Sequence, residues 1–117
     1  MQLVSEAGWL GDYAEDYADL NFKFDTHDPA FNPISMGGSP VVSVYKADDG
    51  TESTAGVTLD DDFDSTPGLH NVNIDLSSDA FYETAKDYMV VLTGATISGI
   101  AVVAVIGHFS IENRFTG

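Results

Sequence analysis

Short runs in which apolar and polar residues alternate, separated by turn signals, constrain the fold of this chain more than any other feature. Every second residue of Leu20–Asp25 is apolar, and a similar alternation returns in Leu69–Asp75. A period of two places the apolar side chains on one face of a β-strand. The β-branched run Val41–Tyr45 ends shortly before Asp49-Gly50, a dipeptide typical of hairpin turns. These runs predict an all-β fold.

Further strands are expected at 56–59, 88–92 and 100–111, with a loop over 26–40. Segment 76–86 is expected to contain a helical turn that Ser78 caps. About seven strands at this spacing are typical of a β-sandwich. We therefore expect a single antiparallel immunoglobulin-like β-sandwich over residues 20–117, preceded by an N-terminal arm over residues 1–19.

The N-terminal segment allows two interpretations. Trp9, Tyr13 and Tyr17 are spaced by four residues, which on a helix would form an aromatic stripe facing a partner. Gly8 and Gly11 weaken the helical interpretation. The alternative is an arm or first strand that lies on the core of the domain itself. The candidate partner-binding residues are Trp9, Leu10, Tyr13 and Tyr17.

The charge of the chain limits the kinds of partner that it is expected to bind. Nineteen Asp and Glu residues stand against four Lys and Arg, which gives a net charge of −15, yet 44% of the residues are hydrophobic. A disordered acidic tail would lack such a large apolar fraction. A strongly anionic surface repels phosphate backbones, so nucleic acid is not an expected partner. It suits a protein that works in salt or calcium, or one that docks on a basic partner.

The absence of cysteine and the hydropathy pattern indicate the cellular compartment in which the chain is expected to assemble. The chain has no cysteine, which fits assembly in a reducing cytoplasm. The most apolar segment, 97–106, is about half of the ~20 residues that a membrane-spanning helix needs. The N-terminus lacks the basic and apolar regions of a signal peptide. No membrane association is expected.

The densest carboxylate cluster is 60–64, where aspartates could supply oxygen ligands to calcium. Asp60, Asp62 and Asp64 match the first three ligand positions of an EF-hand loop. Ser65 replaces the required glycine and Asn71 replaces the final glutamate, so the EF-hand interpretation fails. The alternatives are a solvated strand end and a calcium site in a sandwich loop; no other cofactor is expected.

The histidines and the known catalytic motifs give no sign of an enzyme. His27, His70 and His108 have no neighbour at the sequence spacing of metal ligands. His70 alternates with Val72 and is expected to share its face at one edge of the core. The sequence contains no nucleophile elbow, phosphate-binding loop or dinucleotide fingerprint.

Seven segments occur in the order of a known family: Phe22–His27, Gly38–Lys46, Ala55–Leu59, Asp62–Ser65, Gly68–His70, Asp87-Tyr88 and Gly107–Arg114. Together they resemble a family of small proteins encoded in the structural gene clusters of tailed bacteriophages. The similarity spans roughly residues 12–114 and extends, more loosely, to the N-terminal sandwich domain of phage baseplate and tail-fibre anchoring proteins.

The resemblance implies a non-enzymatic virion structural protein that assembles in the host cytoplasm. Because no shaft follows Arg114, we expect a capsid decoration or cement protein bound outside the particle rather than a fibre protein. Its partners would be the major capsid protein or other virion proteins, and homo-oligomerisation stays open. The alternative role within the particle is a neck, tail or baseplate adaptor or a fibre-anchoring protein.

An alternative from another class is a calcium-dependent carbohydrate-binding surface module. Tyr45, Tyr82 and Tyr88 would stack on sugars, and the cluster 60–64 would hold the ion. The opposing interpretation is that these tyrosines pack locally at strand edges.

Overall fold

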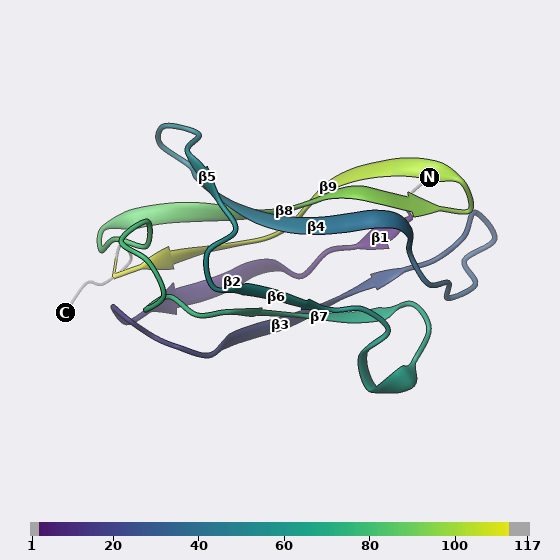
Figure 1. Ribbon diagram of the computed structural model, residues 1–117, viewed down its shortest axis with the longest axis horizontal. Coiled ribbons are helices and arrows are strands. Elements are labelled where there is room, and N and C mark those ends of the chain that lie inside the picture. Colours follow the sequence, from purple (N-terminus) through teal and green to yellow (C-terminus); the bar gives the residue numbers. More distant parts are fainter. Residues whose placement is uncertain (1–2, 113–117) are drawn as a thin grey trace.

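Two β-sheets pack face to face in the computed structural model, which describes residues 3–112 (Figure 1). The predicted all-β sandwich is confirmed. Asn113 and Arg114 of the last family-like segment lie outside the described residues. The strands are β1 (Val4–Ser5), β2 (Gly8–Tyr13), β3 (Leu20–Thr26), β4 (Gly37–Lys46), β5 (Glu52–Ser53), β6 (Val57–Asp60), β7 (Leu69–Ile74), β8 (Lys86–Ile97) and β9 (Ile100–Ile111).

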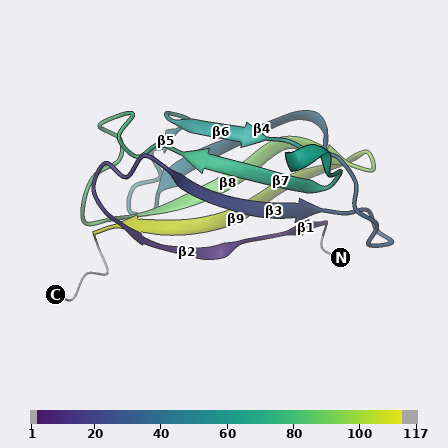
Figure 2. The same ribbon diagram turned by 90° about the horizontal axis from the view of Figure 1, so that it is seen from below.

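The first sheet has the strand order β1-β3-β7-β6 and the second has the order β2-β9-β8-β4-β5. The described chain thus has more strands than the seven expected, partly because β1 and β5 are only two residues long. The expectation of a wholly antiparallel sandwich is wrong at one place, since β2 pairs with β9 in parallel. The chain passes from the first sheet to the second between β1 and β2, and both strands run along one edge in Figure 2.

The N-terminal segment is extended, so the helical interpretation of its aromatic spacing is wrong. β1 pairs with the end of β3, and β2 pairs with the second half of β9. The register of β2 shifts between Trp9 and Gly11, and Gly11 has a φ of 125°. A glycine tolerates this backbone conformation without steric cost. Residues 4–5 and 8–13 of the expected arm are therefore strands of the sandwich itself.

The core lies between the two sheets. Leu20, Phe22 and Phe24 of β3 alternate with exposed residues and are buried, as the sequence predicts. They share the core with Val72 and Ile74 of β7, which pair with β3 in register. The second sheet contributes the buried residues Val42, Val44, Tyr88, Val90, Leu92, Ile97, Ile106, Phe109 and Ile111.

Tyr88, near the start of β8, holds the segment before that strand against the core through hydrogen bonds. Its ring is fully buried, its hydroxyl donates to the Phe81 carbonyl at 3.0 Å, and the Glu83 amide donates to the hydroxyl at 2.7 Å. Immunoglobulin-like domains hold the corner before the equivalent strand with a tyrosine of this kind. This contact and the two strand orders favour the immunoglobulin-like topology, which stays a prediction.

The helical turn expected over 76–86 is wrong. Asp75 and Asp79 accept hydrogen bonds from the amides of Ser77 and Phe81, each two residues on, and so build turns. Such local side-chain bonds compete with a helix. Within residues 3–112 the one helix is the three-residue 3₁₀ turn η1 (Phe63–Ser65), and no helix there is long and apolar enough to cross a membrane.

Candidate functional site: an apolar sheet face and an aspartate–histidine cluster

The outer face of the five-stranded sheet is apolar, and we call it the apolar face. Its inward neighbours on β4, β8 and β9 are buried in the core, so the intervening residues point outward. Val103 also belongs to this face, because Val102 and Ala104 on either side of it pack on the core. The other members form three cross-strand rows, Tyr45–Met89–His108–Trp9, Ser43–Val91–Val105 and Val41–Thr93.

The apolar face is largely accessible, although Ser43 within it is buried, and it carries no full charge at its centre. Val103 is 77% exposed and Trp9 47% exposed. Residues 30–45 and 88–111 contain no Asp, Glu, Lys or Arg, although the chain has a net charge of −15. An antiparallel sheet that faces water on one side normally alternates to polar residues there. Large exposed apolar patches mark interaction sites.

The outer face of the other sheet shows the usual polar pattern. Asn73 donates to Asn21 across two strands at 3.0 Å, and Lys23 donates to Asn71 at 3.2 Å. The Lys23 ammonium also lies 4.4 Å from the centre of the Phe63 ring. The two faces of the sandwich therefore differ sharply in chemistry, and only the five-stranded sheet presents an apolar surface.

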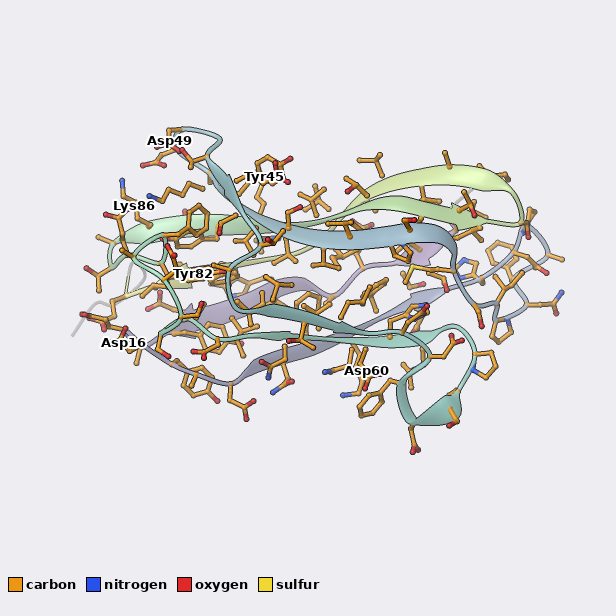
Figure 3. The ribbon with its side chains drawn as sticks, viewed as in Figure 1. Asp16, Tyr45, Asp49, Asp60, Tyr82 and Lys86 are labelled. Carbon is orange, nitrogen blue, oxygen red and sulfur yellow. The ribbon has the colours of Figure 1, made fainter. Side chains whose placement is uncertain are left out.

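A hollow and two groups of carboxylates border the apolar face. The hollow, about 230 Å³, lies between Trp9, Met89 and Val105 and is large enough for a side chain. Glu52 on β5 pairs with Tyr45 at one edge, where Figure 3 shows Tyr45 on the outer side of the sandwich. At one end, Asp87 pairs with Ser110 and the Ser110 hydroxyl donates to the Asp12 carboxylate.

The fold places the four predicted partner-binding residues in different surroundings. Trp9 lies on the apolar face, with its ring 5.5 Å from that of His108. Leu10 and Tyr13 are half-buried and pack against the core, and the Tyr13 hydroxyl donates to the Leu10 carbonyl. Tyr17 is 44% exposed and stacks on Tyr13 at 5.4 Å. They do not form one stripe, because the register shift of β2 between Trp9 and Gly11 turns Leu10 and Tyr13 toward the core and Trp9 outward, and Tyr17 lies beyond the strand.

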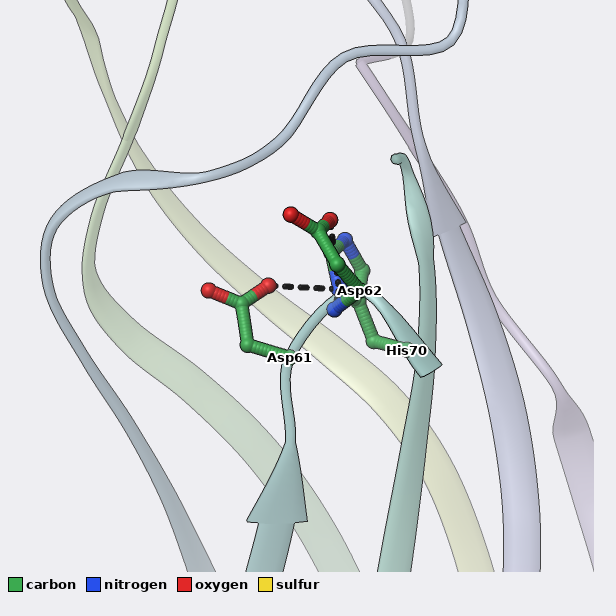
Figure 4. A group of neighbouring side chains, drawn as sticks. All are labelled: Asp61, Asp62 and His70. Atoms are coloured by element: carbon green, nitrogen blue, oxygen red, sulfur yellow. Dashed lines mark hydrogen bonds and ion pairs between the residues drawn. The ribbon is translucent and has the colours of Figure 1, made fainter. Parts of the chain in front are cut away.

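A second candidate site lies where β6 turns into β7. Asp61, Asp62 and His70 bring their ligand atoms within 4.8 Å of one another (Figure 4). The chain reverses through Asp62, which has a φ of 51°, a left-handed conformation that aspartate tolerates better than most residues. Gly68 completes the turn, and a Cβ there would come within 2.8 Å of the Thr26 carbonyl.

Hydrogen bonds fix Asp62 and His70 within this cluster. The Asp62 carboxylate accepts from the Ser35 hydroxyl at 2.5 Å and from the Gly68 amide at 3.1 Å. These bonds lower the pKa of Asp62, because they stabilise its charged form. His70 is fully buried against Phe24, and burial lowers the pKa of its imidazole although Asp61 and Asp62 act in the opposite direction.

The structure alters the expected set of metal ligands. Asp62 is in the cluster, whereas Asp60, which ends β6, and Asp64, in η1, are not. Asp61 and His70 were missed. A hairpin between the two predicted strands would have indicated both residues. This hairpin pairs Asp60 with Asn71, so Asp61 and His70 next to them lie close together. The location of His70 at the edge of the core, next to Val72, is confirmed.

Two of the three tyrosines expected to stack on sugars are buried. Tyr82 is 7% exposed and its hydroxyl donates to the Ala55 carbonyl at 2.6 Å, while Tyr88 is fully buried. The expectation of exposed rings is wrong for both, because they pack with Phe81 as an aromatic cluster. Tyr45 alone lies on an outer face.

Comparison of the chain with protein-family models, with curated proteins and with solved structures found no match.

Proposed function

We propose that this chain is a non-enzymatic structural protein of a bacteriophage virion, a capsid decoration protein that docks on the particle through the apolar face. The resemblance in the sequence supplies the virion setting. The observation that carries the docking role is the exposed valine and tryptophan surface, free of full charges at its centre, on a chain with a net charge of −15. Leaving these side chains in water is unfavourable, and a partner would remove that cost.

The size of the apolar face indicates how the docking works. Four strands ~4.8 Å apart, over about eight residues of ~3.3 Å each, cover on the order of 500 Å². A stable interface buries about 800 Å² on each partner. The apolar face therefore accounts for the centre of an interface, and the bordering groups must contribute the remainder.

The border is acidic at Glu52, Asp87 and Asp12. A partner with an apolar centre and basic residues around it would match both the centre and the border. A second copy of this chain matches the centre only, since two chains of charge −15 repel each other. We therefore assign the face to another virion protein, with the major capsid protein as the first candidate.

Trp9 is the expected anchor of the interface. Aromatic residues beside a hollow often dominate binding energy, and Trp9 lies next to the hollow of about 230 Å³. A side chain from the partner would fill this hollow. Leu10 and Tyr13 act indirectly in this proposal, because they hold β2 against the core.

A matched pair of charge substitutions tests the docking face. Val103→Asp places a carboxylate at an exposed position of the apolar face, while Thr58→Asp adds the same charge to the exposed, polar face of the other sheet. In a titration against purified particles that lack the chain, V103D should bind at least about tenfold more weakly than wild type, because docking would bury an unpaired charge. T58D should bind within about twofold of wild type.

Equal binding by V103D and wild type, or equal losses in both variants, would contradict the proposal. Sedimentation of the chain alone tests the other occupant. A dimer that V103D converts to monomer would reassign the face to a second copy.

A further inference from the structure

We propose that Asp61, Asp62 and His70 bind a divalent transition-metal ion of the zinc class at the turn between β6 and β7. This site is independent of the docking face, which lies on the other sheet. It differs from the calcium hypothesis both in its residues and in its chemistry. Hydrogen bonds fix the orientation and the tautomer of the His70 ring.

The tautomer of His70 follows from its neighbours. The Thr26 hydroxyl lies 2.6 Å from the Ile34 carbonyl, which can only accept, so Thr26 donates its one proton there. The same hydroxyl oxygen lies 2.7 Å from Nε2 of His70 and must therefore accept from it. Nε2 carries the proton, and the neutral ring has its lone pair on Nδ1.

This arrangement is the one that metal-binding histidines use. Their second ring nitrogen donates to a fixed acceptor, which orients the ring and presents the free lone pair to the ion. In this chain the acceptor is Thr26, itself held by Ile34. His70 is fully buried, so its orientation is set by packing as well.

The lone pair of Nδ1 points toward two carboxylates. Asp61 Oδ1 lies 2.8 Å from Nδ1, and Asp62 Oδ1 lies 4.0 Å from it. Ligand atoms on a tetrahedral zinc ion, each about 2.0–2.2 Å from the metal, are roughly 3.3 Å apart. The two distances lie on either side of that value. Rotation of the Asp61 side chain, which is 41% exposed, can lengthen the shorter distance, whereas the longer one requires a small shift of the Asp62 side chain toward Nδ1.

The contacts at Nδ1 compete for the same lone pair. The Asp62 amide donates to Nδ1 at 3.1 Å, which requires the lone pair to be free, while a carboxylate at 2.8 Å from a free lone pair is repelled. A cation between Nδ1 and Asp61 removes this repulsion. Metal binding would replace the amide hydrogen bond, so the Asp62 amide reports directly on the site.

The donor set selects the kind of ion. Calcium prefers six to eight oxygen ligands, whereas zinc accepts an imidazole nitrogen with carboxylate oxygens in a four-coordinate site. The three side chains would supply three ligands, and water would complete the shell. The net charge of −15 raises the local concentration of any cation.

Calorimetric titration of the full chain with Zn²⁺ alone, and separately with Ca²⁺ alone, tests the site. We expect saturable 1:1 binding of Zn²⁺ and none of Ca²⁺ below about 1 mM. Asp61→Asn should weaken zinc binding at least about tenfold. Asp64→Asn removes a neighbouring carboxylate outside the cluster and should leave the affinity within about twofold.

Nuclear magnetic resonance locates the ion. With Zn²⁺, the Nδ1 resonance of His70 and the amide resonance of Asp62 should shift together, in the wild type and in D64N. Absence of zinc binding, equal binding by D61N and wild type, or shifts confined to His27 or His108 would each overturn the proposal. The unfolding temperature of metal-free D61N checks that the variant is folded.

Discussion

Two serines on the outer side of the five-stranded sheet have opposite surroundings. Ser43 is 1% exposed, and its hydroxyl has no hydrogen-bond partner among the described residues. Ser110 is fully buried, but its hydroxyl donates to the Asp12 carboxylate. A buried hydroxyl without a partner is unfavourable, whereas a hydrogen bond to a charged group stabilises the fold. The same substitution should therefore have opposite effects at the two positions.

We expect Ser43→Ala to raise the free energy of unfolding by about 1 kcal/mol, and Ser110→Ala to lower it by about 1–2 kcal/mol. Urea denaturation of the two variants and the wild type measures both changes. A loss of stability in S43A as large as that in S110A would show that the Ser43 hydroxyl contributes a bond in solution.

Asp28 makes a pH-dependent contribution to stability in the loop after β3. Its carboxylate accepts hydrogen bonds from the amides of Asn32 and Ala30, both at 2.9 Å. The Asn32 amide is the main reason that the pKa of Asp28 lies below its ordinary value of 3.8. A group whose pKa is lower in the folded state stabilises the fold above its unfolded pKa, and this stabilisation is lost as the pH falls through the folded pKa.

Wild type should therefore be more stable than Asp28→Ala at neutral pH. The difference should be constant above about pH 5 and shrink as the pH falls below 3.8. Urea midpoints measured between pH 7 and acid give the profile. A difference that does not change with pH would mean that the charged form of Asp28 has no special role.

At the scale of elements, β2 is the strand whose role changed most between sequence and structure. The spacing of Trp9, Tyr13 and Tyr17 resembles a helix face, but the segment pairs with β9. Eight or nine residues cannot distinguish the two periods when glycines interrupt them. The partner of β2 is almost one hundred residues away, and no local pattern encodes a parallel pairing at that separation.

Other elements were predictable for the opposite reason. β3 alternates strictly between buried and exposed residues, so its period and its length can both be read from the sequence. β7 alternates in sequence as well, although Asn71 on its outer side is also buried. β9 is expected and observed over 100–111. The two-residue strands β1 and β5 are too short to carry a period, and they exist because neighbouring strands offer them hydrogen bonds.

Removal of residues 1–13 should destabilise the sandwich. The truncation deletes β1 and β2, exposes the edge of β9 and takes away the packing of Leu10 and Tyr13 on the core. We expect a loss of several kcal/mol and a tendency to aggregate, since an uncovered edge strand pairs with other chains. Thermal unfolding and light scattering measure both effects. A truncated chain with wild-type stability would restore the interpretation of a detachable arm.

In the molecule as a whole, charged side chains of the described residues are absent from the centre of one broad surface, the outer face of the five-stranded sheet. One sheet presents an asparagine and lysine network to water, and the other presents valines and a tryptophan. The acidic composition predicts a charged surface, but the sequence does not show which part of that surface has no charges. That location depends on which alternate residues of β4, β8 and β9 face outward, and the strand bulges shift this alternation.

The candidate metal site illustrates the same point. The spacing of the aspartates predicts Asp62 as a ligand, while His70 and Asp61 join it only because the turn after β6 reverses the chain through left-handed residues. The sequence pattern singles out Asp60, Asp62 and Asp64 as candidate ligands. The fold makes them different, by giving some of them fixed hydrogen-bond partners.

The proposed function requires this chain to be a docked component of a phage particle. Quantitative peptide mass spectrometry of purified phage particles measures its copy number against that of the major capsid protein. We expect about one copy per capsid subunit or per local symmetry axis. A few copies per particle would place the chain at the neck, tail or baseplate, and its absence from the particles would contradict the proposed function.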